Sequence, residues 1–360
     1  MRARTALWAA TIWGDIMAQP SFDSLSKLKS ILITGGTGSF GRQMLRKLLD
    51  ETKLKRIVLY ARGEFAHFEI QNMLTYEERQ RVRFFIGDVR DQDRLLTSMR
   101  GVDLVIHAAA QKQVPLAEYN PFECIRTNVI GAENVVQAAI RAGVPRVLAL
   151  STDKAVNPIN LYGASKLASD KIFVAANSLS AGTQTRFSVV RYGNVLGSRG
   201  SVIPYFRKLL AGGAKQLPIT DPRMTRFWIT LDQAVAFTLS CVEQMRGGEI
   251  FVPKIPSMKI TDLADAMAPG IEARIIGIRP GEKLHELMIV DHNAGHTVEM
   301  KDRYVIEPEW ETWGRRSFMQ DGVPLVAKDF EYSSDKNTDW ISVDELRAIL
   351  AAMPNADAKV

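Results

Sequence analysis

The sequence predicts an α/β protein in which a doubly wound parallel sheet is accompanied by a smaller C-terminal domain. Three observations predict this fold class. From residue 31 onward, short apolar runs typical of buried strands alternate with runs of helical periodicity, a glycine-rich turn follows the first apolar run, and polar side chains follow several of these runs. Strands that alternate with helices form parallel sheets, and such sheets bind ligands at the carboxyl ends of their strands.

Composition agrees with a large core and argues against several classes of protein. The chain has 360 residues, 46% of them hydrophobic, which is enough for one large core and a smaller satellite domain. Cys124 and Cys241 lie in different segments without the spacing of metal ligands, so we expect reduced thiols, no metal and a cytoplasmic protein. The net charge of +6 is spread along the chain, which indicates a solvated surface or an anionic small-molecule partner rather than nucleic acid.

Residues 1–28 are predicted to be a disordered extension. Met1–Arg4 is basic and a short apolar stretch follows, which resembles a weak signal peptide. Asp15 interrupts this stretch, which is also too short to cross a bilayer, so Met17 is a candidate for the true start. Because no other segment is apolar over a sufficient length, we expect no membrane association.

The first strand and its glycine turn predict a dinucleotide site. Residues 31–34 are an apolar strand, and the helix that follows the turn carries apolar residues at helical spacing. Glycines in such a turn let the backbone approach a pyrophosphate and pack the helix on the sheet, while the helix N-terminus attracts the phosphate charge. A glycine turn without a ligand is the alternative. The predicted cofactor contacts are Gly35, Thr37, Gly38, Ser39, Phe40 and Gly41.

The end of the second strand predicts which cofactor binds. An NAD site usually offers Asp or Glu to the ribose 2′-hydroxyl at this point. Here the strand at residues 56–60 continues with Ala61, Arg62 and Gly63. Arg62 can pair with a 2′-phosphate, so NADP is favoured over NAD. Arg62 could equally face solvent, and Glu64 lies close by.

Two further strands end in residues suited to a cofactor. Residues 82–89 form a strand whose last residues, Asp88 and Val89, can flank an adenine ring, although Asp88 could instead cap a helix or turn. Residues 102–110 form an apolar strand whose small terminal residues leave room for a cofactor. His107 in this strand is predicted to be structural. The small residues are Ala108, Ala109 and Ala110.

A short segment after the strand at residues 147–150 brings together an acid, a base and a redox pair. Tyr162 and Lys166 are four residues apart and share a helical face, where the ammonium can lower the phenol pKa and touch a nicotinamide ribose. This pair predicts redox chemistry at a sugar or alcohol carbon. Asp153 and Lys154 are not needed for simple oxidation, so they predict an elimination in the same pocket. The alternatives are a charged lysine that binds phosphate or solvent and an aspartate that caps a turn.

Residues 34–41 and 162–166 resemble the extended short-chain dehydrogenases/reductases. The resemblance spans about residues 29–290. The segments at residues 151–162, 191–201 and 278–286 narrow the resemblance to the inverting UDP-N-acetylglucosamine 4,6-dehydratases. The narrower resemblance implies a Rossmann-type sheet, NADP that is tightly held and regenerated in each turnover, and UDP-N-acetylglucosamine as substrate. It also implies a homo-oligomer, points toward a hexamer, and places the reaction first in pseudaminic acid synthesis for flagellin glycosylation.

The resemblance assigns the chemistry residue by residue. Tyr162 takes the proton of the sugar 4-hydroxyl while Lys166 holds the ribose. Thr152 could hydrogen-bond the 4-hydroxyl, and a purely structural hydroxyl is the alternative. Lys154 then removes the C5 proton of the 4-ketone, and Asp153 protonates the departing 6-hydroxyl. Retaining relatives usually carry an acidic residue at the position of Lys154, so the lysine implies inversion at C5. These roles need burial or the charge of Lys166 to lower the pKa of Lys154, and they need a raised pKa for Asp153.

The resemblance also assigns contacts to the substrate. Two arginines bind the diphosphate, a glutamate accepts from the uridine ribose hydroxyls, backbone near two residues borders the uracil, and an asparagine meets the sugar or a phosphate. Lys112 lies near the sugar and the cofactor, although Gln111 and Gln113 replace the Leu and His that commonly flank this lysine. Each of these side chains could instead form an ion pair or a turn. In the order given, the residues are Arg226 and Arg279, Glu282, Val202 and Pro204, and Asn194.

The predicted organisation has three parts after the extension. Residues 29–194 form the NADP-binding domain, and residues 195–290 form a substrate-binding domain that can return strands to the sheet. Residues 291–360 form a C-terminal tail, in which Ser342 and Glu345 have the spacing of a capping box that opens a terminal helix.

Two other functions are compatible with parts of the sequence. An NADP-linked nucleotide-sugar 4-epimerase needs Tyr162 and Lys166 but no acid–base pair. A non-catalytic NADP-binding regulator needs only the glycine turn. The presence of Asp153 and Lys154 beside the redox pair favours the dehydratase.

Overall fold

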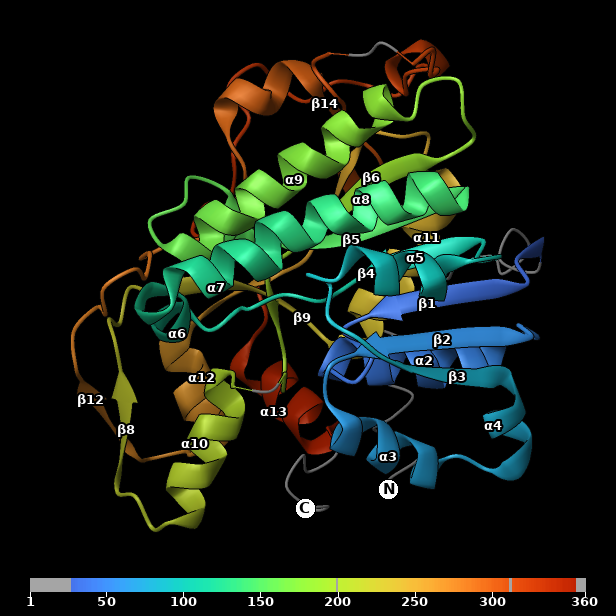
Figure 1. Cartoon of the computed structure of the whole chain (residues 1–360). Helices are drawn as coiled ribbons and strands as arrows, with labels where there is room; N and C mark the ends of the chain where they lie inside the picture. Colours follow the sequence, from blue (N-terminus) through green and yellow to red (C-terminus); the bar gives the residue numbers. More distant parts are fainter. Residues whose placement is uncertain (1–26, 199, 311–312, 354–360) are drawn as a thin grey trace.

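A computed structural model describes residues 27–198, 200–310 and 313–353 (Figure 1). Its main feature is a nine-stranded sheet with the order β14-β15-β10-β6-β5-β4-β1-β2-β3. The bounds are β1 Ser30–Thr34, β2 Arg56–Ala61, β3 Val82–Ile86, β4 Leu104–His107, β5 Arg146–Thr152, β6 Arg186–Tyr192, β10 Ile250–Pro253, β14 Thr297–Glu299 and β15 Arg303–Ile306.

The strands from β3 to β10 pair in parallel, and β15 and β14 add an antiparallel edge. The chain runs outward from β1 through β2 to β3, then crosses to β4 on the other side of β1. The strand order therefore reverses between β1 and β4, and a parallel sheet opens a ligand crevice at the carboxyl ends of such a pair. The predicted α/β class with a doubly wound parallel sheet is confirmed.

A buried contact fixes the ends of β1 and β4 beside this crevice. The Thr34 Oγ1 atom lies 2.8 Å from Nδ1 of His107 and accepts from the backbone N–H groups of Ala108 and Ala109. Because the hydroxyl already accepts twice, its own proton points to Nδ1, which makes His107 a neutral acceptor. The structural role predicted for this histidine agrees with its position.

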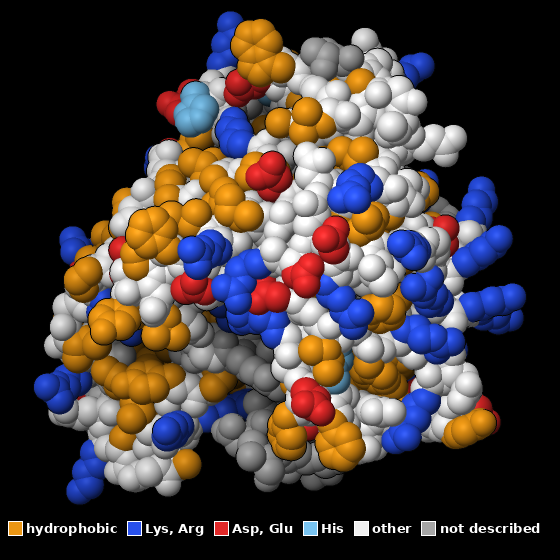
Figure 2. Space-filling model, viewed as in Figure 1, with side chains coloured by type: hydrophobic (Ala, Val, Ile, Leu, Met, Phe, Trp, Pro, Cys, Tyr) orange, Lys and Arg blue, Asp and Glu red, His pale blue; other side chains and the backbone are white. Residues whose placement is uncertain are grey.

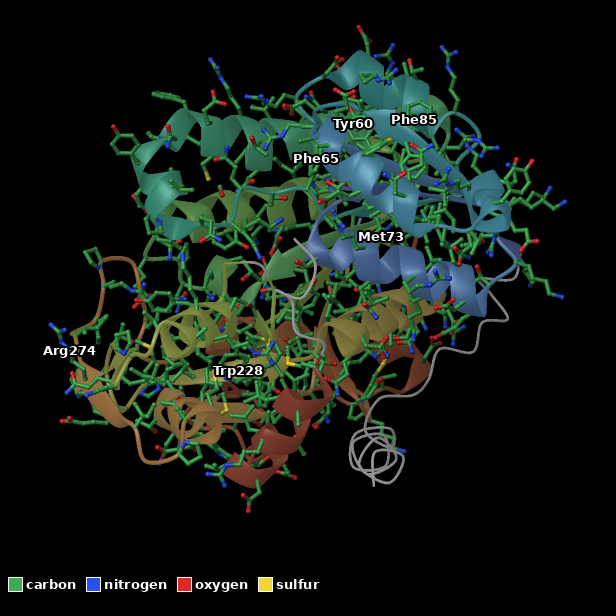
Figure 3. The ribbon with its side chains drawn as sticks, turned by 90° about the horizontal axis from the view of Figure 1, so that it is seen from below. Tyr60, Phe65, Met73, Phe85, Trp228 and Arg274 are labelled. Carbon is green, nitrogen blue, oxygen red and sulfur yellow. The ribbon has the colours of Figure 1, made fainter. Side chains whose placement is uncertain are left out.

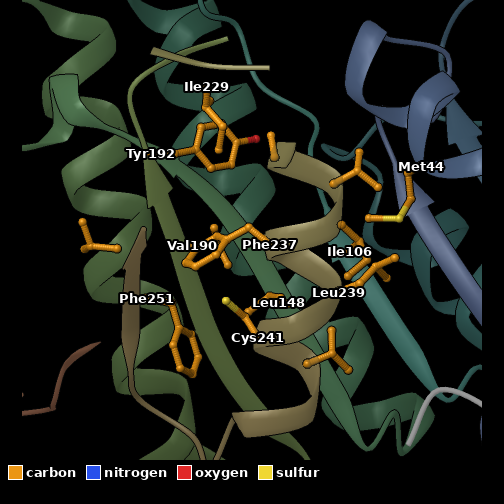
Figure 4. Packing of buried hydrophobic residues seen from close by; sticks show 14 of the residues in the cluster. Met44, Ile106, Leu148, Val190, Tyr192, Ile229, Phe237, Leu239, Cys241 and Phe251 are labelled. Carbon is orange, nitrogen blue, oxygen red and sulfur yellow. The ribbon is translucent and has the colours of Figure 1, made fainter. Parts of the chain in front are cut away.

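Helices cover both faces of the large sheet, so alternate side chains of each strand enter different cores. On β1, Ile31 and Ile33 join a core with α2 and α11, whereas Leu32 joins a core with α5, α8 and α9. Figure 4 shows Phe237 and Leu239 of α11 packed against the central strands. The helix bounds are α2 Ser39–Glu51, α3 Glu64–Met73, α4 Tyr76–Arg81, α5 Gln92–Met99, α6 Val114–Tyr119, α7 Pro121–Ile125, α8 Gly131–Ala142, α9 Leu161–Leu179 and α11 Leu231–Gln244, with a π-helical turn at Arg126–Ile130.

A third core forms the smaller lobe beneath the large sheet. Trp228, almost fully buried, lies inside this lobe (Figure 3), and Leu346 of the last helix packs into the same cluster. The helix α13 begins at a capping box between Ser342 and Glu345. The elements of this lobe are β7 Asn194–Val195, α10 Val202–Ala211, β8 Gln216–Ile219, β9 Thr225–Ile229, β11 Ser257–Lys259, α12 Ile260–Met267, β12 Glu272–Ile275 and α13 Val343–Ala352.

The two lobes exchange segments along the chain. The strand β10 returns from the middle of the chain to the large sheet, and β14 and β15 join it from beyond residue 290. A short sheet of β13 (Leu287–Ile289) and β16 (Tyr332–Ser333) ties the later segments together. The domain boundaries at 194 and 290 stay predictions, with strands of the large sheet on both sides of each.

Residues 1–26 of the predicted extension lie outside the described residues. Among the residues that the structure does describe, none of the helices is long and apolar enough to cross a membrane. The same residues contain no cluster of His, Cys, Asp and Glu side chains that could hold a metal ion.

Candidate active site

The glycine turn has the geometry that its sequence predicts. Gly35 has a φ of +67°, and a Cβ there would lie 2.9 Å from the backbone of Ala108 at the end of β4. A Cβ on Gly41 would lie 2.5 Å from Gly36, so only glycine lets α2 start this close to the turn. The turn therefore leaves backbone N–H groups and the N-terminus of α2 open toward the crevice, which suits a phosphate.

A single cleft of about 1440 Å³ runs from this turn to the smaller lobe. Figure 2 shows Lys and Arg side chains gathered near the centre of the face where the lobes meet. All the predicted cofactor and substrate residues line the cleft. The predicted catalytic residues line it too, except for Asp153. The lining residues predicted from the sequence are Gly35, Thr37, Gly38, Ser39, Phe40, Gly41, Arg62, Asp88, Val89, Ala108, Ala109, Ala110, Lys112, Thr152, Lys154, Tyr162, Lys166, Asn194, Val202, Pro204, Arg226, Arg279 and Glu282.

Asp153 is the predicted site residue that lies behind the wall of the cleft. Its side chain is 0% exposed, and Oδ1 accepts from the Thr152 hydroxyl at 2.9 Å and from Lys154 Nζ at 3.0 Å. The other carboxylate oxygen, Oδ2, is buried and makes no hydrogen bond to the described residues. Asp153 is therefore connected to the cleft only by its hydrogen bonds to Thr152 and Lys154, among the residues that the structure describes.

The chain between β5 and α9 turns sharply, which brings the catalytic candidates together. A single 3₁₀ turn at Asp153–Ala155 follows β5, and Asn157 adopts a left-handed φ of 42°. The Asn160 side chain then caps α9 by accepting from the backbone N–H of Gly163 at 2.8 Å. A Cβ on Gly163 would overlap the Lys154 carbonyl oxygen, so glycine permits this close approach. Tyr162 consequently stands on the first turn of α9 beside the 3₁₀ turn.

Lys154 is held between carboxylates. Its Nζ lies 3.0 Å from Asp153 Oδ1, 3.4 Å from Glu286 Oε1 and 3.3 Å from Asn194 Oδ1. Burial favours the neutral amine, but the charges of Asp153 and Glu286 outweigh burial and raise the pKa of Lys154 above its ordinary value. The expectation of a lowered pKa is wrong for this state of the site, because the expected cation Lys166 is not the charge that dominates. Lys154 rests as an ammonium.

Tyr162 rests as a phenol rather than the expected near-phenolate. Burial raises the pKa of Tyr162 to about 12, while the Lys154 charge and the Thr152 hydroxyl act in the opposite direction. Burial also lowers the pKa of Lys166, against the charge of Asp170. The cation that most favours the phenolate is therefore Lys154, which the sequence assigned to a different step.

The side chains predicted to bind the diphosphate are already paired. Arg226 is buried and donates to backbone carbonyls at Thr225, Lys283 and Leu284. Arg279 lies 2.5 Å from Glu282, the residue predicted to accept from the ribose hydroxyls. Arg279 is thus the more accessible of the two arginines, since its side chain is 65% exposed.

At the other end of the cleft, Arg62 is available to an anion. Its side chain is 59% exposed, and Nη1 lies 3.8 Å from Asp88 Oδ2. Asp88 bonds more closely to Arg90, whose Nη2 lies 2.7 Å from the same oxygen. Burial alone would raise the pKa of Asp88, but the bonds to Arg90 lower it below its usual value. Lys112 is an exposed residue on the lining of the cleft, and partial burial lowers its pKa.

Sequence reasoning missed Glu286 and Lys283. Glu286 is only 2% exposed, lines the cleft, and lies within ion-pair distance of Lys154, Arg226 and Lys283. The sequence could have indicated both residues, because they belong to the segment at 278–286 that supplies Arg279 and Glu282.

Known proteins resemble the chain over most of its length. Residues 31–308 match the family described as polysaccharide biosynthesis protein. The chain is 55% identical over 327 residues to the UDP-N-acetylglucosamine 4,6-dehydratase (inverting) of Campylobacter jejuni strain 81-176, covering 89% of this chain and 97% of that one. It is 38% identical over 332 residues to the UDP-glucose 4-epimerase of Rickettsia canadensis, covering 90% and 96%.

Solved structures agree. Pen from Bacillus thuringiensis superposes with a TM-score of 0.81 at 34% identity, over 91% of this chain and 99% of that one. DesIV, the dTDP-glucose 4,6-dehydratase of Streptomyces venezuelae solved with NAD, gives a TM-score of 0.62 at 26% identity, over 71% and 86%. The chain belongs to the polysaccharide biosynthesis protein family, a group of extended short-chain dehydrogenases/reductases that includes the inverting UDP-N-acetylglucosamine 4,6-dehydratases.

Proposed function

We propose that this protein is an NADP-dependent UDP-N-acetylglucosamine 4,6-dehydratase that inverts C5. The product would be UDP-2-acetamido-2,6-dideoxy-β-L-arabino-hex-4-ulose, an intermediate suited to pseudaminic acid-type sugars. The observation that carries the proposal is the meeting of Tyr162, Lys154 and Asp153 at the end of β5, where an acid–base pair adjoins a redox residue. The identity of 55% to a dehydratase supports the substrate.

The cleft fits a dinucleotide cofactor. The Gly35 turn and the start of α2 form a cradle that a Cβ would fill, which suits a pyrophosphate. Arg62 would pair with a 2′-phosphate, and Lys166 would hold the nicotinamide ribose. When bound, NADP supplies the site for hydride removed from C4 and later returned to C6, so that it ends each turnover unchanged.

Tyr162 would take the proton of the 4-hydroxyl as a phenolate, after the resting phenol has released its own proton to solvent. Its pKa of about 12 in the resting site means that this ionisation needs positive charge nearby. Lys154 supplies such charge as an ammonium. Lys166 lies one helical turn after Tyr162 on α9. The resting ionisation of Lys154 therefore assists the first step.

The elimination needs Lys154 neutral and Asp153 protonated. Transfer of one proton from Lys154 Nζ to Asp153 Oδ1, across their 3.0 Å hydrogen bond, produces both forms at once. Lys154 then takes the C5 proton, the C5–C6 double bond forms, and the C6–O bond breaks as Asp153 gives its proton to the leaving hydroxyl. Thr152 bridges the buried carboxyl to the cleft. Water leaves, the ammonium and carboxylate are restored, and a proton that derives from solvent returns to C5 as hydride returns to C6.

Incubation with UDP-N-acetylglucosamine in deuterated water tests the function. A dehydratase gives a 6-deoxy-4-keto sugar nucleotide with deuterium at C5 and inverted configuration, resolved by NMR and mass spectrometry. A 4-epimerase gives UDP-N-acetylgalactosamine without loss of water. The 4-epimerase is the second candidate function, because the Rickettsia relatives are named UDP-glucose 4-epimerase. Formation of UDP-N-acetylgalactosamine alone would exclude the dehydratase.

Arg62→Ala is expected to weaken NADP binding roughly tenfold to a hundredfold, because one charge-assisted contact to the 2′-phosphate is lost. NAD lacks that phosphate, so its affinity should stay nearly constant. Titration of both cofactors by calorimetry measures the two constants. Arg83→Ala is the matched control, since Arg83 lies on the neighbouring strand and bonds to the carbonyls of Gln80 and Val82. Equal losses for both cofactors would contradict the assignment.

The proposed enzyme is a homo-oligomer. The support is a set of exposed apolar side chains on α6 and α7, which a second copy of the chain could cover: Leu116, Tyr119 and Phe122.

A further inference from the structure

We propose that Glu286 is a positioning residue that holds Lys154 in place and keeps it a strong base. This inference rests on the proposed function, in which Lys154 removes the C5 proton. Glu286 is separated from Lys154 by more than a hundred residues of sequence, yet its Oε1 lies 3.4 Å from Nζ inside the cleft.

Glu286 lies at the centre of a cluster of cations. Its Oε1 is 3.7 Å from Arg226 Nε, and its Oε2 is 3.9 Å from Lys283 Nζ. The residue is almost fully buried, and Oε2 makes no hydrogen bond to the described residues. A buried carboxylate without close hydrogen bonds is costly to ionise unless nearby cations compensate. Its position is therefore explained by the charges around it rather than by local hydrogen bonding.

The backbone fixes Glu286 at this point. Its N–H donates to the Ser334 hydroxyl at 2.9 Å, and its carbonyl accepts from the Ser334 N–H at 2.9 Å. Further along the same segment, Lys283 Nζ donates to the Val156 carbonyl, and Asn160 Nδ2 donates to the Gly281 carbonyl at 2.8 Å. The carboxylate is thus carried by a segment that is anchored to Ser334 and to the chain just after Lys154.

Five charged or titratable groups face Lys154 from the elements around it. Asp153 comes from the 3₁₀ turn, Tyr162 from α9, Arg226 from β9, and Lys283 and Glu286 from the segment before β13. The two carboxylates favour the ammonium, and the two cations oppose it.

The two carboxylates have different fates in the proposed elimination. Asp153 becomes neutral when it accepts the Lys154 proton. Glu286 is then the negative charge that remains beside the amine, and it stabilises the ammonium that forms when the C5 proton arrives. Asp153 would supply the proton, while Glu286 would set the strength of the base.

Glu286→Gln in the full-length protein tests this role, since the amide keeps the shape and removes the charge. Removing a negative charge should lower the pKa of Lys154 by at least about one pH unit. We expect the ¹³Cε resonance of Lys154, in protein labelled with ¹³C-lysine and assigned with Lys154→Arg, to titrate at correspondingly lower pH. Above the Lys154 pKa the Lys154–Asp153 pair loses the proton that it shares, so the fall in the rate of dehydration at high pH should move to lower pH by the same amount.

Two further variants guard against a purely structural effect. Glu286→Asp keeps the charge but withdraws it by one methylene, so its pH profile of dehydration should stay close to that of wild type. If the glutamine variant does not fold, the Lys154 titration is measured in the aspartate variant, where the greater distance should lower the Lys154 pKa by a smaller amount. Glu249→Gln removes another buried carboxylate, 3.1 Å from Arg315 and outside the cleft lining. It should lower the melting temperature and leave the Lys154 titration unchanged.

A Lys154 resonance that titrates identically in Glu286→Gln and wild type would overturn the inference. So would a shifted titration with an unshifted pH profile of dehydration, because Lys154 would then not be the base that Glu286 controls. Failure of wild-type protein to dehydrate UDP-N-acetylglucosamine overturns the proposed function instead. The NMR titration needs no turnover, which keeps the two failures distinguishable.

Discussion

Lys154→Ala is expected to abolish the elimination while the 4-hydroxyl of the substrate is still oxidised. Loss of a general base costs roughly a hundredfold to ten-thousandfold in rate. The variant also removes an ammonium that favours the Tyr162 phenolate, so the oxidation should slow as well, by a smaller factor. Rapid-mixing absorbance of the reduced nicotinamide follows the oxidation, and NMR in deuterated water follows C5 exchange and dehydration.

The matched control for this variant is Lys254→Ala. Lys254 also pairs with a carboxylate, 2.7 Å from Glu299, but it does not line the cleft. Dehydration by this control should equal that of wild type. If Lys154→Ala still dehydrated the sugar at an undiminished rate, Lys154 could not be the base. The proposal of inversion at C5, which depends on this lysine, would then lose its support.

Tyr162→Phe is expected to stop the reaction before the elimination. Without the phenol, the 4-hydroxyl has no acceptor for its proton, and we expect a loss of roughly a hundredfold to ten-thousandfold in the oxidation. Neither reduced nicotinamide nor C5 deuterium should accumulate, which separates this variant from Lys154→Ala. The substrate affinity should change little, and equilibrium binding of UDP-N-acetylglucosamine measures it.

Tyr304→Phe removes a hydroxyl from another buried tyrosine, one that packs against Phe330 and Tyr332 away from the cleft. It should retain full activity. Rapid formation of reduced nicotinamide by Tyr162→Phe would contradict the role of the phenol as the proton acceptor.

The features that were predictable from sequence depend on short stretches of chain. The glycine turn at Gly35 is required by a local φ and by contact with the adjacent strand, and both are encoded within one βα unit. The segment from Thr152 to Tyr162 likewise forms its own turn and helix cap. Helical and strand periodicity placed the central parallel strands for the same reason.

The features that were missed depend on contacts between distant segments. Burial opposes the charge of Lys154, but Asp153 and then Glu286 raise its pKa, and the fold brings Glu286 from a distant segment of the chain to 3.4 Å from Lys154 Nζ. No periodicity or spacing in the chain encodes that distance. The pairing of Arg279 with Glu282 shows the same limit at close range, because sequence assigned each side chain to the substrate without weighing their attraction to each other.

The burial of His107, which contacts Thr34, makes the stability of the fold depend on pH. Burial first, and the charge of Lys166 second, lower the pKa of His107 from 6.5 to about 3 in the folded protein. In the unfolded chain the same ring takes up a proton near its ordinary value, so below about pH 6.5 the unfolded state binds the extra proton. The stability that His107 contributes is therefore complete above that pH and is lost progressively on acidification toward the folded pKa. The burial of His107 between β1 and β5, beside the crevice, thus also makes the sheet sensitive to acid.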